Sequence, residues 1–176
     1  DLFKKKMDLD IQVSKLRMLK QSYLSERYEL EDKILKYYPR EINNYEERIQ
    51  GYKSDVALAV QHEPQDEDSF PPMTLNGKTY TEKADAGQML LEICKHNTSS
   101  KSVKIGNYRG FQIEVYYDTM SAEYRLNLCG SLKHMVSLGS DAYGNLTRIE
   151  NTLSRIPAKL ETAINRSEEH TSELQS

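Results

Sequence analysis

The stretch from residue 8 to residue 42 is DLDIQVSKLRMLKQSYLSERYELEDKILKYYPREI, and it decides the first third of the fold. Apolar side chains recur here every seven residues, as in the seam of a coiled coil. They are Leu9, Leu16, Tyr23, Leu30 and Tyr37. The spacing predicts one long helix over residues 7–37. Lys20 and Arg27 interrupt the second row of the seam, which indicates partly exposed packing.

A proline then interrupts the heptad pattern. Pro39 has no backbone N–H and disfavours a helical residue before it, so we expect the first helix to end there. A second helix is predicted over residues 40–62 from its narrow apolar seam. Its members are Ile42, Tyr45, Ile49, Tyr52 and Val56. The short break favours an antiparallel hairpin in which each seam covers the other. The alternative is one kinked helix that pairs with another chain or domain.

The pattern changes after an acidic, proline-containing linker at residues 63–72. Residues 73–75 and 78–80 predict a tight hairpin, because Asn76-Gly77 supplies the positive φ that such turns need. Thr81 is placed to cap a helix that runs to about His96.

Four short strands are predicted between residues 103 and 138, since apolar and polar side chains alternate along them. Short turns join the strands, so they must be antiparallel. An amphipathic helix follows from about Asn145 and kinks or restarts at Pro157. The expected fold class is α+β. A long, coiled-coil-like helical hairpin in residues 1–62 precedes a small antiparallel sheet with flanking helices in residues 73–165.

Composition excludes several classes of protein. Hydrophobic residues make up 38% of the chain, there is no Trp, and the net charge is −3, so neither a large buried core nor a strongly basic nucleic-acid module is expected. No apolar run is long enough to cross a bilayer. The two cysteines are far apart, which predicts free thiols and a cytoplasmic location.

The final segment, RSEEHTSELQS at residues 166–176, has a different origin. It matches, codon for codon, the translation of a common sequencing-library adapter. We therefore expect these residues to be non-native and disordered, and the natural reading frame to be interrupted near Asn165.

No motif for catalysis is present. The chain has neither a glycine-rich phosphate loop nor a dinucleotide fingerprint. Cys94 and His96 lie two positions apart on a predicted helix, so they point in different directions and cannot share a metal ion well. The Ser, His and Asp residues show no spacing that singles out a triad. No catalytic, cofactor-binding or metal-binding residue is assigned.

A few basic residues are candidate contacts for a DNA backbone. They are Lys4, Lys5, Lys6, Arg17, Lys20, Arg109 and Arg125. Interspersed acids favour a solvated helix face for the first five of them. The segment from Arg109 to Tyr116 partly matches an RNA-recognition motif, but Ile113 replaces its second stacking aromatic. Binding of duplex DNA by this chain alone is expected to be weak.

Five segments carry a resemblance to a known family. They are KMDLDIQVSKLRMLK (6–20), LEDKILKYYPREI (30–42), NGKTYTEKADAG (76–87), IGNYRGFQIEVYYD (105–118) and GNLTRIENTL (144–153). In this order they resemble the C-terminal region of very large Swi/Snf-type helicases. These proteins are often fused to an adenine-specific DNA methylase and are carried by bacterial conjugative elements and phages.

The resemblance implies that the parent is a DNA-dependent ATPase that uses ATP with Mg, and S-adenosylmethionine where the methylase is present. Its catalytic motifs would lie upstream of Asp1. The chain is then a non-catalytic accessory region that braces the motor or positions DNA, with the upstream helicase domains as its partners and no membrane contact. The alternative is a self-contained interaction module, in which a coiled-coil arm oligomerises and an α+β head binds a protein.

Overall fold

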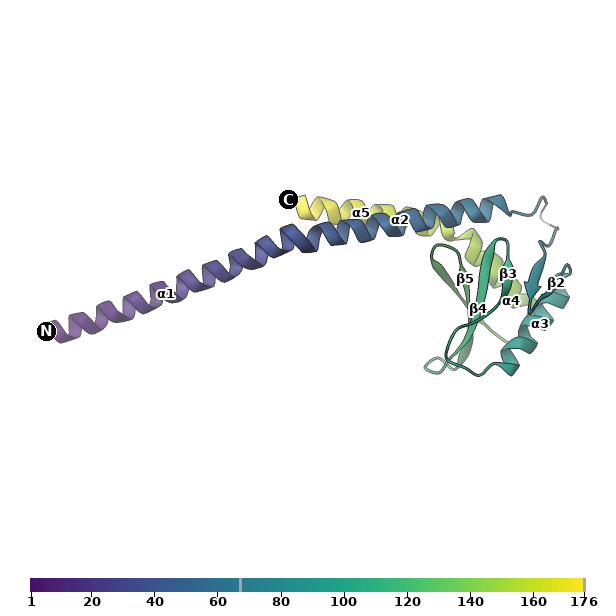
Figure 1. The fold of residues 1–176 in the computed structure, drawn as a ribbon, viewed down its shortest axis with the longest axis horizontal. Coiled ribbons are helices and arrows are strands. Elements are labelled where there is room, and N and C mark those ends of the chain that lie inside the picture. Colours follow the sequence, from purple (N-terminus) through teal and green to yellow (C-terminus); the bar gives the residue numbers. More distant parts are fainter. Residues whose placement is uncertain (67, 176) are drawn as a thin grey trace.

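A continuous helical rod forms the first third of the chain (Figure 1). The computed structural model describes residues 1–66 and 68–175. Helix α1 (Leu2–Asp32), the π-helical turn η1 (Lys33–Tyr37) and helix α2 (Tyr38–Gln61) follow one another without a loop. We call α1 and η1 together, residues 2–37, the arm. No residue of the arm is buried.

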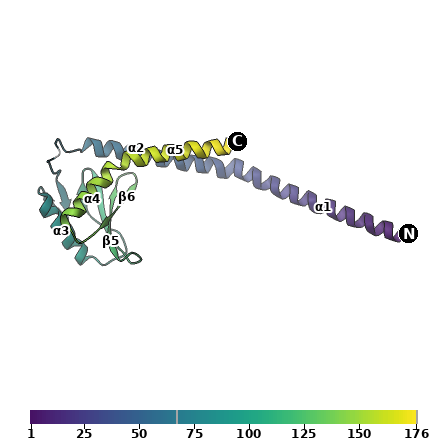
Figure 2. The ribbon, with the colours of Figure 1, turned by 180° about the vertical axis from the view of Figure 1, so that it is seen from behind.

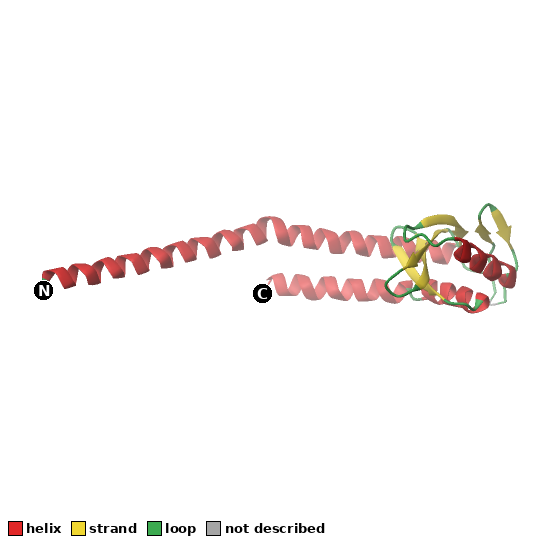
Figure 3. Ribbon diagram, turned by 90° about the horizontal axis from the view of Figure 1, so that it is seen from below, coloured by secondary structure: helices red, strands yellow, loops and turns green. Residues whose placement is uncertain are grey.

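The predicted hairpin within residues 1–62 is therefore not formed, and the alternative of one kinked helix describes the rod (Figure 3). Pro39 lies in the first turn of α2. The N–H of Tyr38 donates to the carbonyl of Lys33, five residues earlier, rather than to the usual fourth. A π turn changes the local hydrogen-bond register, and so the helix accommodates the missing N–H of the proline without ending.

The rest of the chain centres on a six-stranded sheet in the order β2-β1-β3-β4-β5-β6, with every neighbouring pair antiparallel. Its strands are β1 (Met73–Leu75), β2 (Lys78–Tyr80), β3 (Val103–Tyr108), β4 (Phe111–Asp118), β5 (Glu123–Cys129) and β6 (Lys133–Leu138). The α+β class is confirmed. Positive φ values at Asn76 and Gly77 confirm the predicted turn, and Arg109 and Gly110 form a second turn of this kind.

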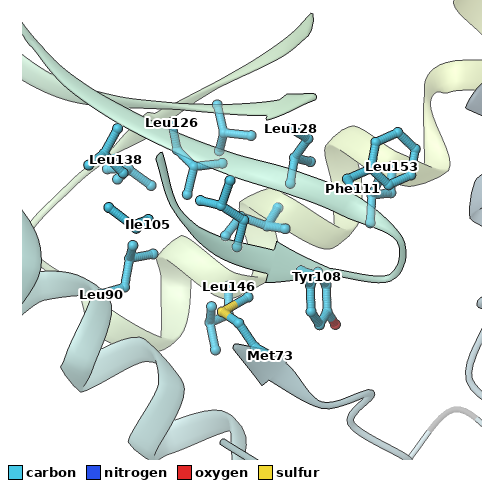
Figure 4. Close-up of a cluster of buried hydrophobic side chains, with 14 of the residues drawn as sticks. Met73, Leu90, Ile105, Tyr108, Phe111, Leu126, Leu128, Leu138, Leu146 and Leu153 are labelled. Carbon is cyan, nitrogen blue, oxygen red and sulfur yellow. The ribbon is translucent and has the colours of Figure 1, made fainter. Parts of the chain in front are cut away.

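Helices cover one face of the sheet. Helices α3 (Lys83–His96) and α4 (Ala142–Ser154) pack against each other and against the strands. The N-cap of α3 is Glu82 rather than the predicted Thr81. Apolar side chains from both layers meet in the core, including Leu90, Phe111 and Leu146, which are fully buried (Figure 4).

Helix α5 (Ile156–Gln175) pairs with α2 rather than with the sheet (Figures 2 and 3). The apolar seam predicted in the second helix is real, but its partner is this C-terminal helix instead of residues 7–37. Residues 166–175 continue α5, and the side chain of His170 lies 2.9 Å from that of Glu41. The expected disorder is thus wrong for these residues, because the segment contains no Pro or Gly to end the helix. Ser176 lies outside the described residues.

Candidate functional site

The predicted DNA contacts do not form one site. The five predicted contacts on the arm (Lys4, Lys5, Lys6, Arg17 and Lys20) are exposed along α1, which extends away from the sheet (Figure 1). Arg109 and Arg125 lie in the α+β part of the chain. The structure therefore separates the seven residues into five exposed residues on the arm and two arginines that are already paired.

Arg109 has a structural role in place of the predicted DNA contact. Its side chain is buried and forms an ion pair with Glu150, with Nη1 lying 2.9 Å from Oε2. Nη2 donates to the carbonyl of Ala59 at 2.8 Å, and Nε donates to that of His62 at 3.1 Å. These carbonyls belong to the last turn and C-cap of α2, where helix groups lack partners of their own. Arg109 thus holds the end of α2 on the sheet.

Arg125 is likewise neutralised. On β5, its Nε lies 3.1 Å from Asp118 Oδ2 and its Nη2 lies 3.2 Å from Glu123 Oε1. Two carboxylates surround one guanidinium, so this part of the sheet offers no surplus positive charge to a phosphate. The predicted DNA contact at Arg125 has no support from the local charges.

A different basic surface is formed where α2, β6 and α5 meet. We call it the basic groove. It has a volume of about 810 Å³. Basic side chains from α2, from β6, and from α5 with the residue before it line the groove. They are Arg48 on α2, Lys133 on β6, Arg155 between α4 and α5, Lys159 in the first turn of α5, and Arg166 from the adapter-like segment. Among the described residues that line the groove, none is acidic. Tyr45 and Tyr52 supply aromatic rings to its wall.

A buried polar cluster fixes one wall of the groove. Asp55 of α2 is 1% exposed and accepts hydrogen bonds from the backbone N–H groups of Ser131 at 2.7 Å and Leu132 at 3.1 Å. Its Oδ2 also lies 2.7 Å from Nε2 of His134, which is 2% exposed. The close approach requires Gly130, since a Cβ there would lie 2.2 Å from Asp55 Oδ1. The cluster therefore fixes α2 to the turn between β5 and β6.

The junction between α4 and α5 fixes the opposite wall. Helix α4 ends at Ser154, Arg155 is its C-cap, and α5 begins at Ile156, whose side chain is fully buried. Pro157 follows in the first turn of α5, where the absence of an N–H is tolerated. The predicted restart at Pro157 is confirmed. It turns the chain so that Arg155 and Lys159 face α2 across the groove.

The charges of the groove are only partly compensated. Lys133 Nζ lies 3.1 Å from Glu114 Oε2, and this hydrogen bond and charge raise the pKa of the lysine. Burial is the largest influence on Glu114 and raises its pKa, but the hydrogen bond and charge of Lys133, together with hydrogen bonds to Asn127 and Cys129, lower the pKa of the carboxyl overall. Arg155 and Lys159 have no ion-pair partner within the described part of the chain. The arrangement can attract an anion.

The amino-acid sequence alone does not indicate this groove. Its four basic residues outside the adapter-like segment, Arg48, Lys133, Arg155 and Lys159, come from distant parts of the chain. The one local signal is the pair Arg155 and Lys159, which lie four positions apart and so share a face of a helix. That signal alone is common on solvated helices and does not identify a site.

Other kinds of site are not found in the described residues. No group of three or more His, Cys, Asp or Glu side chains there could hold a metal ion. Within the same residues, no helix has the length and apolar character needed to span a membrane. Cys94 and Cys129 are free thiols, and burial raises the pKa of Cys94 to about 11, which disfavours its reactive thiolate form.

Comparison with known proteins identifies no relative. No family model matches the chain, and neither a curated protein nor a solved structure matches it. The features of the molecule that bear on function are the arm, the basic groove and the residues that hold them in place.

Proposed function

We propose that this chain is a non-catalytic accessory module whose arm pairs with a helix from another segment or another chain. The observation that carries the proposal is the long apolar row left exposed on the arm. Its members, with their exposed fractions, are Leu2 (86%), Leu9 (60%), Leu16 (65%), Tyr23 (65%), Leu30 (57%) and Tyr37 (49%).

Exposure of this apolar row is costly for an isolated protein. Soluble monomers seldom expose large contiguous apolar surfaces, and such surfaces usually mark sites of interaction. The heptad spacing makes the row straight enough for one partner helix, which would insert its own side chains between those of the arm. The apolar seam of α2 already has such a partner in α5, whereas the arm has none in the described chain.

The second row of the seam indicates what kind of partner fits. Three of its five members are basic: the row is Lys6, Val13, Lys20, Arg27 and Ile34. In a parallel pair of identical arms, each of these residues would face its own copy, so that Lys20 would lie against Lys20 and Arg27 against Arg27. Like charges at such positions are destabilising. A different helix with acidic residues opposite this row is the better partner.

The sequence resemblance suggests which part of a larger protein would supply the partner helix. In a large Swi/Snf-type helicase with a DNA methylase, the upstream domains of the same chain would supply the partner helix, and the accessory region would brace the motor. ATP with Mg, and S-adenosylmethionine, would then be bound by the parent's upstream domains. Oligomerisation of the chain through the arm is the competing function, and the partner of the arm distinguishes the two.

The test uses the full chain and a designed helical peptide about five heptads long, with Leu at one seam row and Glu at the other. We expect the peptide to bind and to form a one-to-one complex by light scattering. The variant Leu9→Ser/Leu16→Ser should weaken binding by about 3–6 kcal/mol, from the usual 1.5–3 kcal/mol per buried side chain.

Met18→Ser/Gln21→Ser is the matched control, because Met18 is equally exposed but lies outside the apolar row. Loss of binding in this control as well would show that pairing does not use the row. A dimer of the chain that forms without peptide, and that Leu9→Ser/Leu16→Ser dissociates, would establish self-pairing. If neither complex forms, the proposal is wrong.

A further inference from the structure

We infer that the basic groove binds the phosphate backbone of a single-stranded nucleic acid. This inference does not depend on the pairing of the arm, because the groove lies between α2, β6 and α5 and contains no arm residue.

The basic groove carries surplus positive charge. Four basic side chains line the groove: Arg48, Lys133, Arg155 and Lys159. Among these four, Lys133 alone forms an ion pair, and its partner Glu114 does not line the groove. Arg155 directly precedes α5 and Lys159 lies in its first turn, and both line the groove. The positive end of the helix dipole adds to their field. Clustered cations in a concave surface raise the local concentration of a polyanion.

The arrangement of the groove is rigid, which distinguishes it from a solvated row of lysines. On one side, the Asp55 cluster ties α2 to the turn before β6. On the other side, the buried Ile156 anchors the first turn of α5 to the core. Arg48 Nη2 also donates to the hydroxyl of Tyr52 at 3.3 Å, which holds its guanidinium at the groove. Less conformational entropy is then lost when an anion binds.

The aromatic residues favour an unpaired strand over a duplex. Tyr45 is half-buried with its ring centroid 5.2 Å from that of His170, Tyr52 is buried, and both tyrosines line the groove beside the cations. Proteins that bind single strands combine a positive groove along the backbone with aromatic rings on which bases stack. A base in a duplex is already stacked and cannot use Tyr45 in this way. An acidic peptide would use the charges but would gain little from the ring.

The experiment measures fluorescence anisotropy of a labelled oligothymidine of roughly 12 nucleotides with the full chain. We expect binding that weakens with salt, with a slope of log K against log salt of about −3 for four phosphate contacts on a single strand. The unlabelled single strand should compete better than a duplex of equal length. Polyglutamate of similar charge should compete poorly.

The decisive variant is Arg155→Glu/Lys159→Glu. A carboxylate in the first turn of α5 is compatible with the helix dipole, so the fold should persist, as a circular-dichroism melt will check. We expect binding to weaken at least about tenfold and the salt slope to fall by about half, because two of four contacts are removed. Tyr45→Leu should weaken binding of the single strand without changing the salt slope.

Lys4→Glu/Lys5→Glu is the matched control, because it changes the net charge equally on the exposed arm. It should alter binding less than twofold. Equal losses in both double variants would reduce the effect to overall charge and overturn the inference. So would the absence of binding at about 50 mM salt, or competition by polyglutamate that equals competition by the single strand. Arg166→Gln should retain binding, whereas a complete loss would assign the site to the adapter-like segment.

Discussion

Removal of the carboxylate of Asp55 should lower the free energy of unfolding, because this side chain holds α2 against the sheet. The side chain is 1% exposed and holds two backbone N–H groups and the ring of His134 within hydrogen-bond distance. In Asp55→Ala all three groups lose their partner. Breaking a buried pair costs about 3–5 kcal/mol when one side is left unsatisfied. The backbone groups of Ser131 and Leu132 are only partly buried, so water will satisfy them in part and the total should remain in this range.

The conservative variant sharpens this prediction. In Asp55→Asn, an oxygen can still accept from Ser131, but the amide nitrogen replaces Oδ2, which faces both Leu132 and His134. A donor then opposes the N–H of Leu132. One unsatisfied donor costs about 1–3 kcal/mol, so Asp55→Asn should be destabilising by less than Asp55→Ala.

The assay is urea denaturation followed by near-ultraviolet circular dichroism of tyrosine. This signal reports packing of buried rings such as Tyr52 and Tyr108, and the exposed arm contributes little to it. A loss of about 3–5 kcal/mol corresponds to a fall in Tm of roughly 6–20 °C for a chain of this size. Asp10→Ala, which makes the same chemical change on the exposed arm, should have no measurable effect. Equal stability of Asp55→Ala and Asp10→Ala would refute the proposed role of the cluster.

Three further outcomes are expected. Arg109→Met should destabilise the chain by about 3–5 kcal/mol in urea, because Glu150 and the last carbonyls of α2 lose their donor; an unchanged midpoint would contradict the capping role. The pKa of Glu114 is lowered in the folded chain, so its contribution to stability is present above pH 4.5 and is lost as the pH falls through the folded pKa. Lys133→Met should therefore reduce the acid-induced fall in the urea midpoint, and an identical fall in both proteins would exclude the pair as its source. Cys94, with a pKa of about 11, should react with a disulfide reagent at about pH 8 more slowly than the half-buried Cys129, whereas equal rates would show that Cys94 is accessible.

Local patterns identified most elements of the α+β part. The alternation along residues 111–117 predicted β4, and the Asn76-Gly77 turn set the register of β1 and β2. Both signals depend on neighbours in the chain, and backbone geometry translates them directly into a strand or a turn. The seam of α2 and the restart at Pro157 were predictable for the same reason.

The candidate site was less predictable. The sequence predicts Arg109 as a candidate DNA contact, but the fold turns its guanidinium inward onto the end of α2. Arg155 and Lys159 carried no motif, and only the pairing of α5 with α2 places them opposite Arg48. Charge and residue type can be read from the sequence, whereas the side of the protein that a residue occupies depends on its partners.

The arm separates what local sequence periodicity determines from what tertiary packing determines. Heptad spacing over residues 7–37 determined that this segment is helical with an apolar residue at every seventh position, because the period of a helix is a property of its own backbone. The same spacing assigned that row to the wrong partner, since periodicity describes a face but not the segment that covers it. Tertiary structure decided that α5 takes the seam of α2 and that the arm stays exposed. The π turn η1 allowed the helical rod to continue past Pro39. Because the rod continues, the arm cannot fold back onto α2, and packing between distant segments instead brings α5 to the seam of α2.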